Sequence, residues 1–119
     1  MRRVHRTFTG IVGNGSKTAA KLGFPTLNIP LGDADVSGIY AGMVEIGGAP
    51  YMAAIFADPK RNLLEAHLLD FSADAYGKDI TVELHEKIRD RMDFENESKL
   101  IAAIAKDIAD VRQYFREVY

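Results

Sequence analysis

The clearest alternation of apolar and polar positions lies between residues 80 and 88. Ile80, Val82 and Leu84 are each followed by a polar residue, the last of which is His85. Side chains alternate between the two faces of a strand, so this pattern predicts a strand with its apolar residues inward and its polar residues outward. Other apolar segments bounded by turn residues predict further extended segments, at residues 7–12, 26–29, 38–46, 51–56 and 63–69.

The last part of the chain changes from a strand pattern to a helix pattern. Its apolar residues recur every three or four positions, which predicts one long amphipathic helix. Asn96 is a suitable N-cap, and Glu97 follows it at the positive end of the helix dipole. The stripe comprises Ile101, Ile104, Ile108, Val111, Phe115 and Val118.

Short strands followed by one helix favour a mainly β domain without βαβ units. The Gly47-Gly48 pair predicts a tight turn between residues 38–46 and 51–56, which makes these two segments a hairpin. The pattern is compatible with an antiparallel barrel or a sandwich of five to seven strands. In either case the helix would pack on the outside or across one end.

Composition narrows the class of protein. The 119 residues fit one domain, 1–119, and the net charge of −2 gives no support for a nucleic-acid or membrane surface. The chain has no cysteine, which excludes disulfides, thiolate zinc sites and a cysteine nucleophile. It shows no signal peptide and no apolar stretch of membrane-spanning length. We expect a cytoplasmic monomer, complete from Met1.

Residues 10–30 concentrate candidate phosphate chemistry. Ser16 stands where the P-loop signature needs its lysine, and Gly23 and Pro25 would end a following helix, so a P-loop is excluded. Small and basic residues there would still let backbone amides and positive charge approach an anion. Taken alone, Gly-Asn-Gly is a turn signal first and a phosphate signal second, so a plain turn is the favoured interpretation. The candidate nucleotide-binding residues are Gly13, Asn14, Gly15, Lys17 and Lys21.

Thr26 and Asn28 form a candidate magnesium site. They lie two residues apart in an extended segment, so both side chains should share one face. Mg²⁺ commonly takes one or two protein oxygens and completes its shell with phosphate oxygens and water. Two neutral oxygen ligands beside a candidate phosphate site fit this mode of coordination.

Glu65 is the most informative single residue, because it interrupts an apolar strand. If it is partly buried beside a cleft, it is a candidate general base; an exposed position on the outer face explains it equally well. His67, on the same face, could orient Glu65, although we favour a solvated or partly packed histidine. Arg89, Arg91 and Phe94 could stack on a flat ring, although the pattern alone favours a solvated basic turn.

Several segments, in order, resemble the riboflavin kinase family, which also forms the C-terminal module of bifunctional FAD synthetases. Residues 22–28, LGFPTLN, resemble its Pro-Thr-Ala-Asn segment, and residues 38–42, GIYAG, resemble the following strand. Residues 65–71, EAHLLDF, with DAYGK at 74–78, resemble its glutamate strand and turn. The resemblance spans nearly the whole chain.

This resemblance implies a six-stranded antiparallel Greek-key barrel with a long C-terminal helix. It implies transfer of the ATP γ-phosphoryl group to the 5′-hydroxyl of riboflavin, giving FMN. Thr26 and Asn28 would hold Mg²⁺ and nucleotide phosphates, and Glu65 would accept the hydroxyl proton. Tyr76 would lie near the nucleotide. The flavin would be contacted by Arg89, Met92 and Phe94.

An alternative is a flavin- or nucleotide-binding barrel without turnover. Residues 18–21, TAAK, stand where the family usually carries Gly and Arg, and Leu27 replaces a small residue. The connection at residues 57–62 is also short. The resemblance includes no adenylyltransferase module, so FAD synthesis by this chain is not expected.

Overall fold

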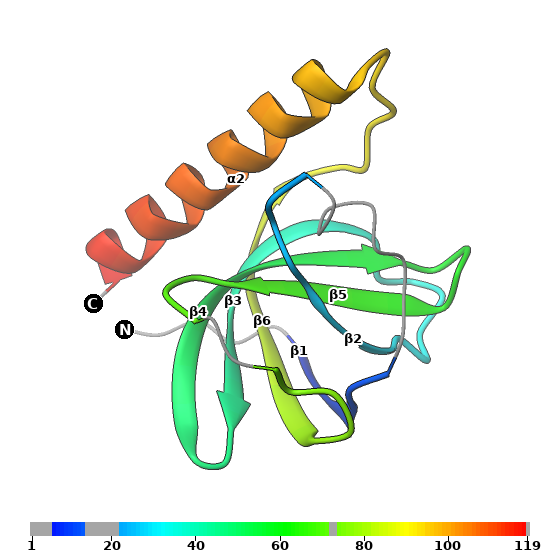
Figure 1. Cartoon of the computed structure of the whole chain (residues 1–119), viewed down its shortest axis with the longest axis vertical. Coiled ribbons are helices and arrows are strands. Elements are labelled where there is room, and N and C mark those ends of the chain that lie inside the picture. Colours follow the sequence, from blue (N-terminus) through cyan, green and yellow to red (C-terminus); the bar gives the residue numbers. More distant parts are fainter. Residues whose placement is uncertain (1–5, 14–21, 72–73, 119) are drawn as a thin grey trace.

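The computed structural model describes residues 6–13, 22–71 and 74–118. Within them, six antiparallel strands precede one long helix, as Figure 1 shows. The strands are β1 (Arg6–Ile11), β2 (Leu27–Pro30), β3 (Gly38–Ile46), β4 (Ala49–Asp58), β5 (Leu63–Leu68) and β6 (Asp79–Arg89), and the helix is α2 (Glu97–Val118).

The strands form a nearly closed Greek-key barrel. Their order in the sheet is β1-β6-β3-β4-β5-β2. Strands β3, β4 and β5 follow one another, and β6 returns to lie beside β3, which is the Greek-key arrangement. The two ends of the sheet approach each other through an isolated bridge between Gly13 and Asn28. The expected mainly β barrel with a C-terminal helix is therefore confirmed, and the sandwich alternative is not.

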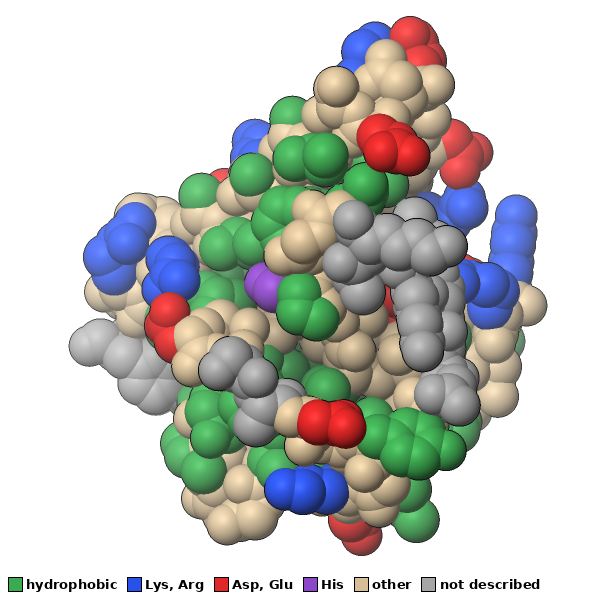
Figure 2. Space-filling view, viewed as in Figure 1, with side chains coloured by type: hydrophobic (Ala, Val, Ile, Leu, Met, Phe, Trp, Pro, Cys, Tyr) green, Lys and Arg blue, Asp and Glu red, His purple; other side chains and the backbone are tan. Residues whose placement is uncertain are grey.

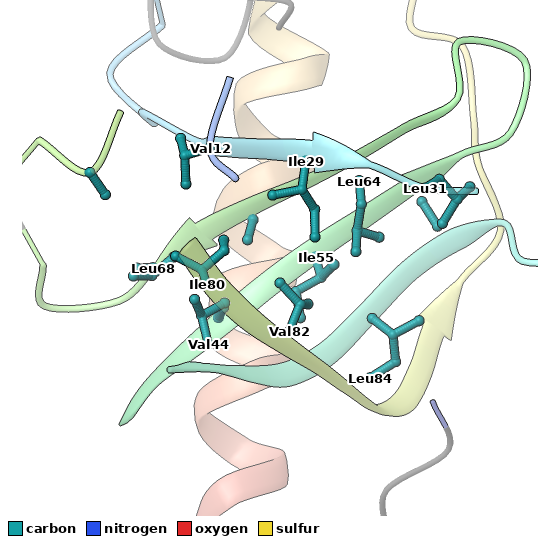
Figure 3. Packing of buried hydrophobic residues seen from close by; sticks show 14 of the residues in the cluster. Val12, Ile29, Leu31, Val44, Ile55, Leu64, Leu68, Ile80, Val82 and Leu84 are labelled. Atoms are coloured by element: carbon teal, nitrogen blue, oxygen red, sulfur yellow. The ribbon is translucent and has the colours of Figure 1, made fainter. Parts of the chain in front are cut away.

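Alternation along the strands builds the core inside the barrel. Ile80, Val82 and Leu84 of β6 are buried, as their spacing predicts. They meet Ile55 of β4 and Leu64 of β5 in one continuous apolar cluster (Figure 3). Burying an aliphatic side chain of this size contributes about 1.5–3 kcal/mol relative to exposure, so this cluster is a principal source of stability.

The helix α2 covers the outer face of β3 and β4. Val111 and Phe115 are buried there against Ala41, which is small enough for the helix to approach the sheet. The Asn96 side chain accepts a hydrogen bond from the Lys99 amide at 3.0 Å, which confirms the predicted N-cap. The predicted stripe is buried only in the C-terminal half of the helix.

The N-terminal half of α2 lies differently. Ile101 is 38% exposed. Leu100 and Ile104 face a cavity rather than the apolar core. The stripe therefore serves two surfaces, the barrel wall at one end and a candidate site at the other.

His85 corrects a prediction, because it was expected to face outward and is fully buried. Ala41 pairs with Glu86 and Gly42 pairs with Leu84, so His85 is the extra residue of a β-bulge in β6. Its ring lies under α2 and bonds to Tyr114 Oη at 3.1 Å. Beside the bulge, the backbones of β3 and β6 lie close together at Gly42. A Cβ at this position would lie 2.0 Å from the Glu83 carbonyl oxygen, so only glycine fits there.

The strand boundaries differ from the predicted ones mainly at β4. This strand extends to Asp58 because it pairs with β3 from Ala49 to Ala57 and with β5 as far as the Asp58–Leu63 pair. Gly47 and Gly48, both at positive φ, make the predicted turn. Two residues that were expected in a polar connection, Ala57 and Asp58, are therefore buried parts of the sheet.

Candidate functional site

One row of directly opposed residues crosses five strands of the barrel. Arg89 lies opposite Ile39, and Ile39 lies opposite Phe56. Phe56 in turn lies opposite Glu65, and Glu65 lies opposite Asn28. Side chains of directly opposed residues lie on the same face of a sheet. The row therefore places the predicted flavin, base and metal residues on one surface, the outer face of the barrel wall.

A cavity of about 580 Å³ lies over this row. Its walls come from the outer face of the barrel, the segment between β6 and α2, and the N-terminal half of α2. Phe56 and Ile39 give it an apolar floor, and Glu65 and Arg89 give it charged edges. Figure 2 shows hydrophobic side chains gathered where the helix meets the barrel. An apolar cavity with a few polar groups is typical of small-molecule sites.

Glu65 is buried beside the cavity. Of the two positions that the sequence left open, it does not take the exposed one. Its exposed fraction is 6%, and its Oε1 accepts a hydrogen bond from Arg61 Nη2 at 2.8 Å. Burial raises the pKa of Glu65, against the opposing effects of Arg61 and a hydrogen bond with Thr26. A carboxyl group that gains proton affinity in a cavity is suited to general-base chemistry.

Arg61 also contacts a second buried carboxylate. Its Nε donates to Asp58 Oδ2 at 2.6 Å, and Asp58 is only 4% exposed. Burial works against ionisation of Asp58, but the Arg61 hydrogen bond and charge outweigh it and lower the pKa of Asp58. Neither residue was singled out from the sequence, because their meeting with Glu65 depends on the turn between β4 and β5.

Asn28 carries a buried side-chain oxygen that the described residues leave unsatisfied. The residue is 7% exposed, and its Oδ1 has no hydrogen-bond partner among the residues that the structure describes. An orphaned buried oxygen calls for an explanation such as an ion. Neutral amide and hydroxyl oxygens beside one carboxylate are hard ligands of the kind that Mg²⁺ takes, so Asn28 and Thr26 fit this cation.

Arg89 is held at the other end of the cavity. Its Nε and Nη2 donate to the two carboxylate oxygens of Asp107 at 2.9 and 2.8 Å. Its guanidinium carbon also lies 5.6 Å from the centre of the Phe94 ring. The interpretation of this segment as a solvated basic turn is therefore wrong for Arg89, because a buried carboxylate on α2 fixes its side chain.

Asp107 was missed as a site residue, although a signal was present. It lies three residues after Ile104 and four before Val111, on the same side of the helix as the apolar stripe. A carboxylate within such a stripe needs a partner. Asp107 is 4% exposed, and Arg89 is that partner.

His67 is partly packed, as predicted. Its Nδ1 lies 2.8 Å from the carbonyl oxygen of Pro25, and its ring meets Phe24 edge-on at 5.8 Å. These contacts fix the segment that precedes Thr26. His67 thus supports the wall of the cavity from β5.

The predicted site residues are only partly brought together. Five of them line the cavity: Thr26, Glu65, Arg89, Met92 and Phe94. Asn28 is not among the lining residues, although it lies opposite Glu65 and beside Gly13. Tyr76 is 61% exposed and is also absent from the lining. Four predicted phosphate contacts lie outside the described residues: Asn14, Gly15, Lys17 and Lys21.

Comparison with known proteins identifies the family. The model for the flavokinase family, described as riboflavin kinase, matches residues 3–115. The chain belongs to the riboflavin kinase family. The resemblance drawn from residues 22–28, 38–42, 65–71 and 74–78 is thereby confirmed.

The chain is similar to bifunctional riboflavin kinase/FMN adenylyltransferases from several bacteria. It is 36% identical to the protein of Escherichia coli K12 over 121 residues, covering 90% of this chain and 37% of that protein. It is 38% identical to the protein of Pseudomonas fluorescens, with 87% and 36% covered, and 30% identical to that of Bacillus subtilis, with 89% and 37% covered. The chain thus spans little more than a third of these relatives.

A solved structure has the same fold. A crystal structure described as a macrolide-efflux protein from Streptococcus pneumoniae matches with a TM-score of 0.75 and 26% identity. The match covers 89% of this chain and 36% of that one.

Within the residues described for the present riboflavin kinase family member, no helix is both long enough and apolar enough to span a bilayer.

Proposed function

We propose that this chain is a Mg²⁺-dependent riboflavin kinase. It would transfer the γ-phosphoryl group of ATP to the 5′-hydroxyl of riboflavin and release FMN. The observation that carries this proposal is the row from Arg89 to Asn28, which sets these two residues at opposite ends of one face with Glu65 between them. Family membership and the curated relatives support the same reaction.

The flavin would lie at the Arg89 end. Phe94 and Met92 offer apolar surface there, and Met92 is 57% exposed and so available to a ligand. An aromatic ring stacks on an isoalloxazine, and a guanidinium fixed by Asp107 offers a flat cationic edge. Because the Asp107 pair fixes Arg89 in advance, little side-chain entropy is lost on binding.

The nucleotide phosphates and Mg²⁺ would lie at the Asn28 end. Thr26 and Asn28 would hold the ion, which supplies charge neutralisation on the phosphates when bound. The backbone near Gly13 would approach the same region, since Gly13 bridges to Asn28. The nucleotide would also be contacted by Asn14, Gly15, Lys17, Lys21 and Tyr76.

Glu65 would orient the riboflavin hydroxyl and take its proton. Its position between the two ends is where a ribityl chain would pass from flavin to phosphate. Phosphoryl transfer needs little covalent chemistry from the protein, so placement of the hydroxyl supplies much of the catalysis. Burial keeps water away from the carboxylate and leaves it to the substrate.

The test is product analysis. The purified chain is incubated with riboflavin, ATP and Mg²⁺, and the flavins are separated by chromatography. We expect FMN that disappears when EDTA removes the ion. No FMN with ATP, CTP or GTP, together with tight riboflavin binding, would contradict the kinase and favour the binding barrel without turnover.

A further inference from the structure

The turn between β4 and β5 places a cluster of three charged residues at the edge of the cavity. Asp58 ends β4, Arg61 follows three residues later, and Glu65 lies four residues beyond Arg61 on β5. Arg61 Nε lies 2.6 Å from Asp58 Oδ2, and Arg61 Nη2 lies 2.8 Å from Glu65 Oε1. One guanidinium therefore joins two carboxylates from adjacent strands.

We propose that Arg61 is a positioning residue of the site, with Asp58 as its anchor. The pair would hold the carboxylate of Glu65 in one orientation through Oε1, so that Oε2 is the oxygen that accepts the substrate proton. This inference rests on the proposed kinase function and adds two residues to it. It assigns the turn a role in turnover beyond connecting two strands.

Asp58 explains why the arginine is in place. It is 4% exposed and also accepts a hydrogen bond from the Lys60 amide at 3.1 Å, so the turn itself fixes its carboxylate. A buried carboxylate that is itself held by a hydrogen bond fixes an arginine well. The planar guanidinium group can donate to such a carboxylate in only a few orientations. Arg61 therefore reaches Glu65 from a pre-ordered position rather than from solvent.

The charge balance favours a positioning role over direct contact with phosphate. Arg61 has one positive charge and already faces two carboxylates at hydrogen-bond distance. Its side chain is 44% exposed, whereas those of Asp58 and Glu65 are 5% and 8% exposed. Moving the cation to a phosphate would leave two buried carboxylates without the positive charge that now faces them, which is costly.

The test compares kcat and KM in matched variants of the whole chain. For Arg61→Gln we expect kcat to fall about 10- to 100-fold, since a carboxylate that is no longer held samples unproductive orientations. The KM for riboflavin should change less than about two-fold, because Arg61 does not bind the flavin ring. Arg61→Lys should recover part of the loss, and Asp58→Asn should lower kcat by a smaller factor than Arg61→Gln.

A double variant separates positioning from a general loss of structure. In a Glu65→Gln background, adding Arg61→Gln should cause no further fall in kcat, because the residue that it positions is already gone. Arg112→Gln serves as the control, since it breaks an exposed contact with Asp70 that lies outside the cavity. Its kcat should match that of the wild type.

Three kinetic outcomes would overturn the role of Arg61. They are an unchanged kcat in Arg61→Gln, a raised KM at constant kcat, and an equal loss in the Glu65→Gln background. NMR of the Arg61 side chain gives a readout without activity: its Nε–H signal should be protected from solvent exchange, and Asp58→Asn should abolish that protection. An unprotected signal in the wild type would also overturn the proposal. A wild-type chain that shows the protected signal but forms no FMN would instead overturn the proposed kinase function.

Discussion

Asn28 of β2 lies directly opposite Glu65 of β5 in the antiparallel register. Both side chains are buried, and both lie on the face that the apolar core does not use. Neither residue would be stable there as an isolated polar group, because burial of an unpaired polar atom is costly. The proposed site for an ion and a substrate hydroxyl would account for both, and the predictions below test it.

The first prediction concerns the ion. Asn28→Ala should raise the Mg²⁺ concentration for half-maximal FMN formation on the order of ten-fold, because one hard oxygen ligand is lost. The measurement is a Mg²⁺ titration of initial rate at saturating substrates. Gln113→Ala, at an exposed amide on α2, is the control and should leave the titration unchanged. An Asn28→Ala titration that coincides with that of the wild type would exclude Asn28 as a ligand.

The second prediction concerns the flavin end. Phe94→Ala should raise the Kd for riboflavin about 3- to 10-fold, in line with the ~0.5–1.5 kcal/mol that a stacked aromatic pair contributes. Quenching of flavin fluorescence gives this Kd directly. Tyr76→Ala should leave it unchanged, since Tyr76 lies outside the cavity lining. A larger effect of Tyr76 than of Phe94 would place the flavin elsewhere.

The third prediction concerns the link between helix and barrel. Asp107→Asn should lower the free energy of unfolding by about 3 kcal/mol, because it leaves Arg89 without its buried partner. Urea denaturation measures this change. Asp110→Asn, which breaks an exposed pair with Lys106, should cost less than about 0.5 kcal/mol. Equal effects of the two substitutions would mean that the Arg89 pair does not fasten the helix.

The fourth prediction concerns pH and two carboxylates with opposite shifts. The pKa of Glu65 is raised above its ordinary value of 4.5, so its stabilising contribution is full below that pH and is lost as pH rises through the folded-state pKa. The pKa of Asp58 is lowered from 3.8, so its contribution is present above pH 3.8 and is lost as pH falls through the folded-state pKa.

Thermal unfolding without Mg²⁺ tests both signs. Glu65→Gln should raise Tm relative to wild type at pH 7, and the difference should shrink as pH approaches 4. Asp58→Asn should lower Tm at pH 7, and that difference should shrink below about pH 4. Parallel Tm curves for wild type and either variant would contradict the assigned direction of shift.

The strands and the core were predictable because each depends on local alternation. The alternation of Ile80, Val82 and Leu84 with polar residues predicts that these three side chains are buried, and Asn96 predicts the start of the helix. The buried state of His85 was not predictable in this way. It depends on a bulge in β6 and on a helix that covers it from about thirty residues further along the chain.

The site was predictable residue by residue but not as an arrangement. Thr26, Glu65 and Arg89 were proposed from their types and from family resemblance, and all three line one cavity. Their common surface depends on strand register, which the sequence does not state. Arg61 was missed because its partners become visible only when the strands are packed together. Asp107 lay within the apolar stripe, but the stripe does not show that Arg89 is its partner.

The most direct measurement is transfer of labelled phosphate by the wild type and by Glu65→Gln. Each protein is mixed with riboflavin, Mg²⁺ and ATP labelled at the γ-phosphoryl group, and the label in FMN is followed with time. Glutamine keeps the shape of the side chain but cannot take a proton, so the rate should fall about 10²- to 10⁴-fold while riboflavin still binds. Equal rates of labelling would contradict the account, because the buried carboxylate beside Asn28 in the row would then have no part in the transfer.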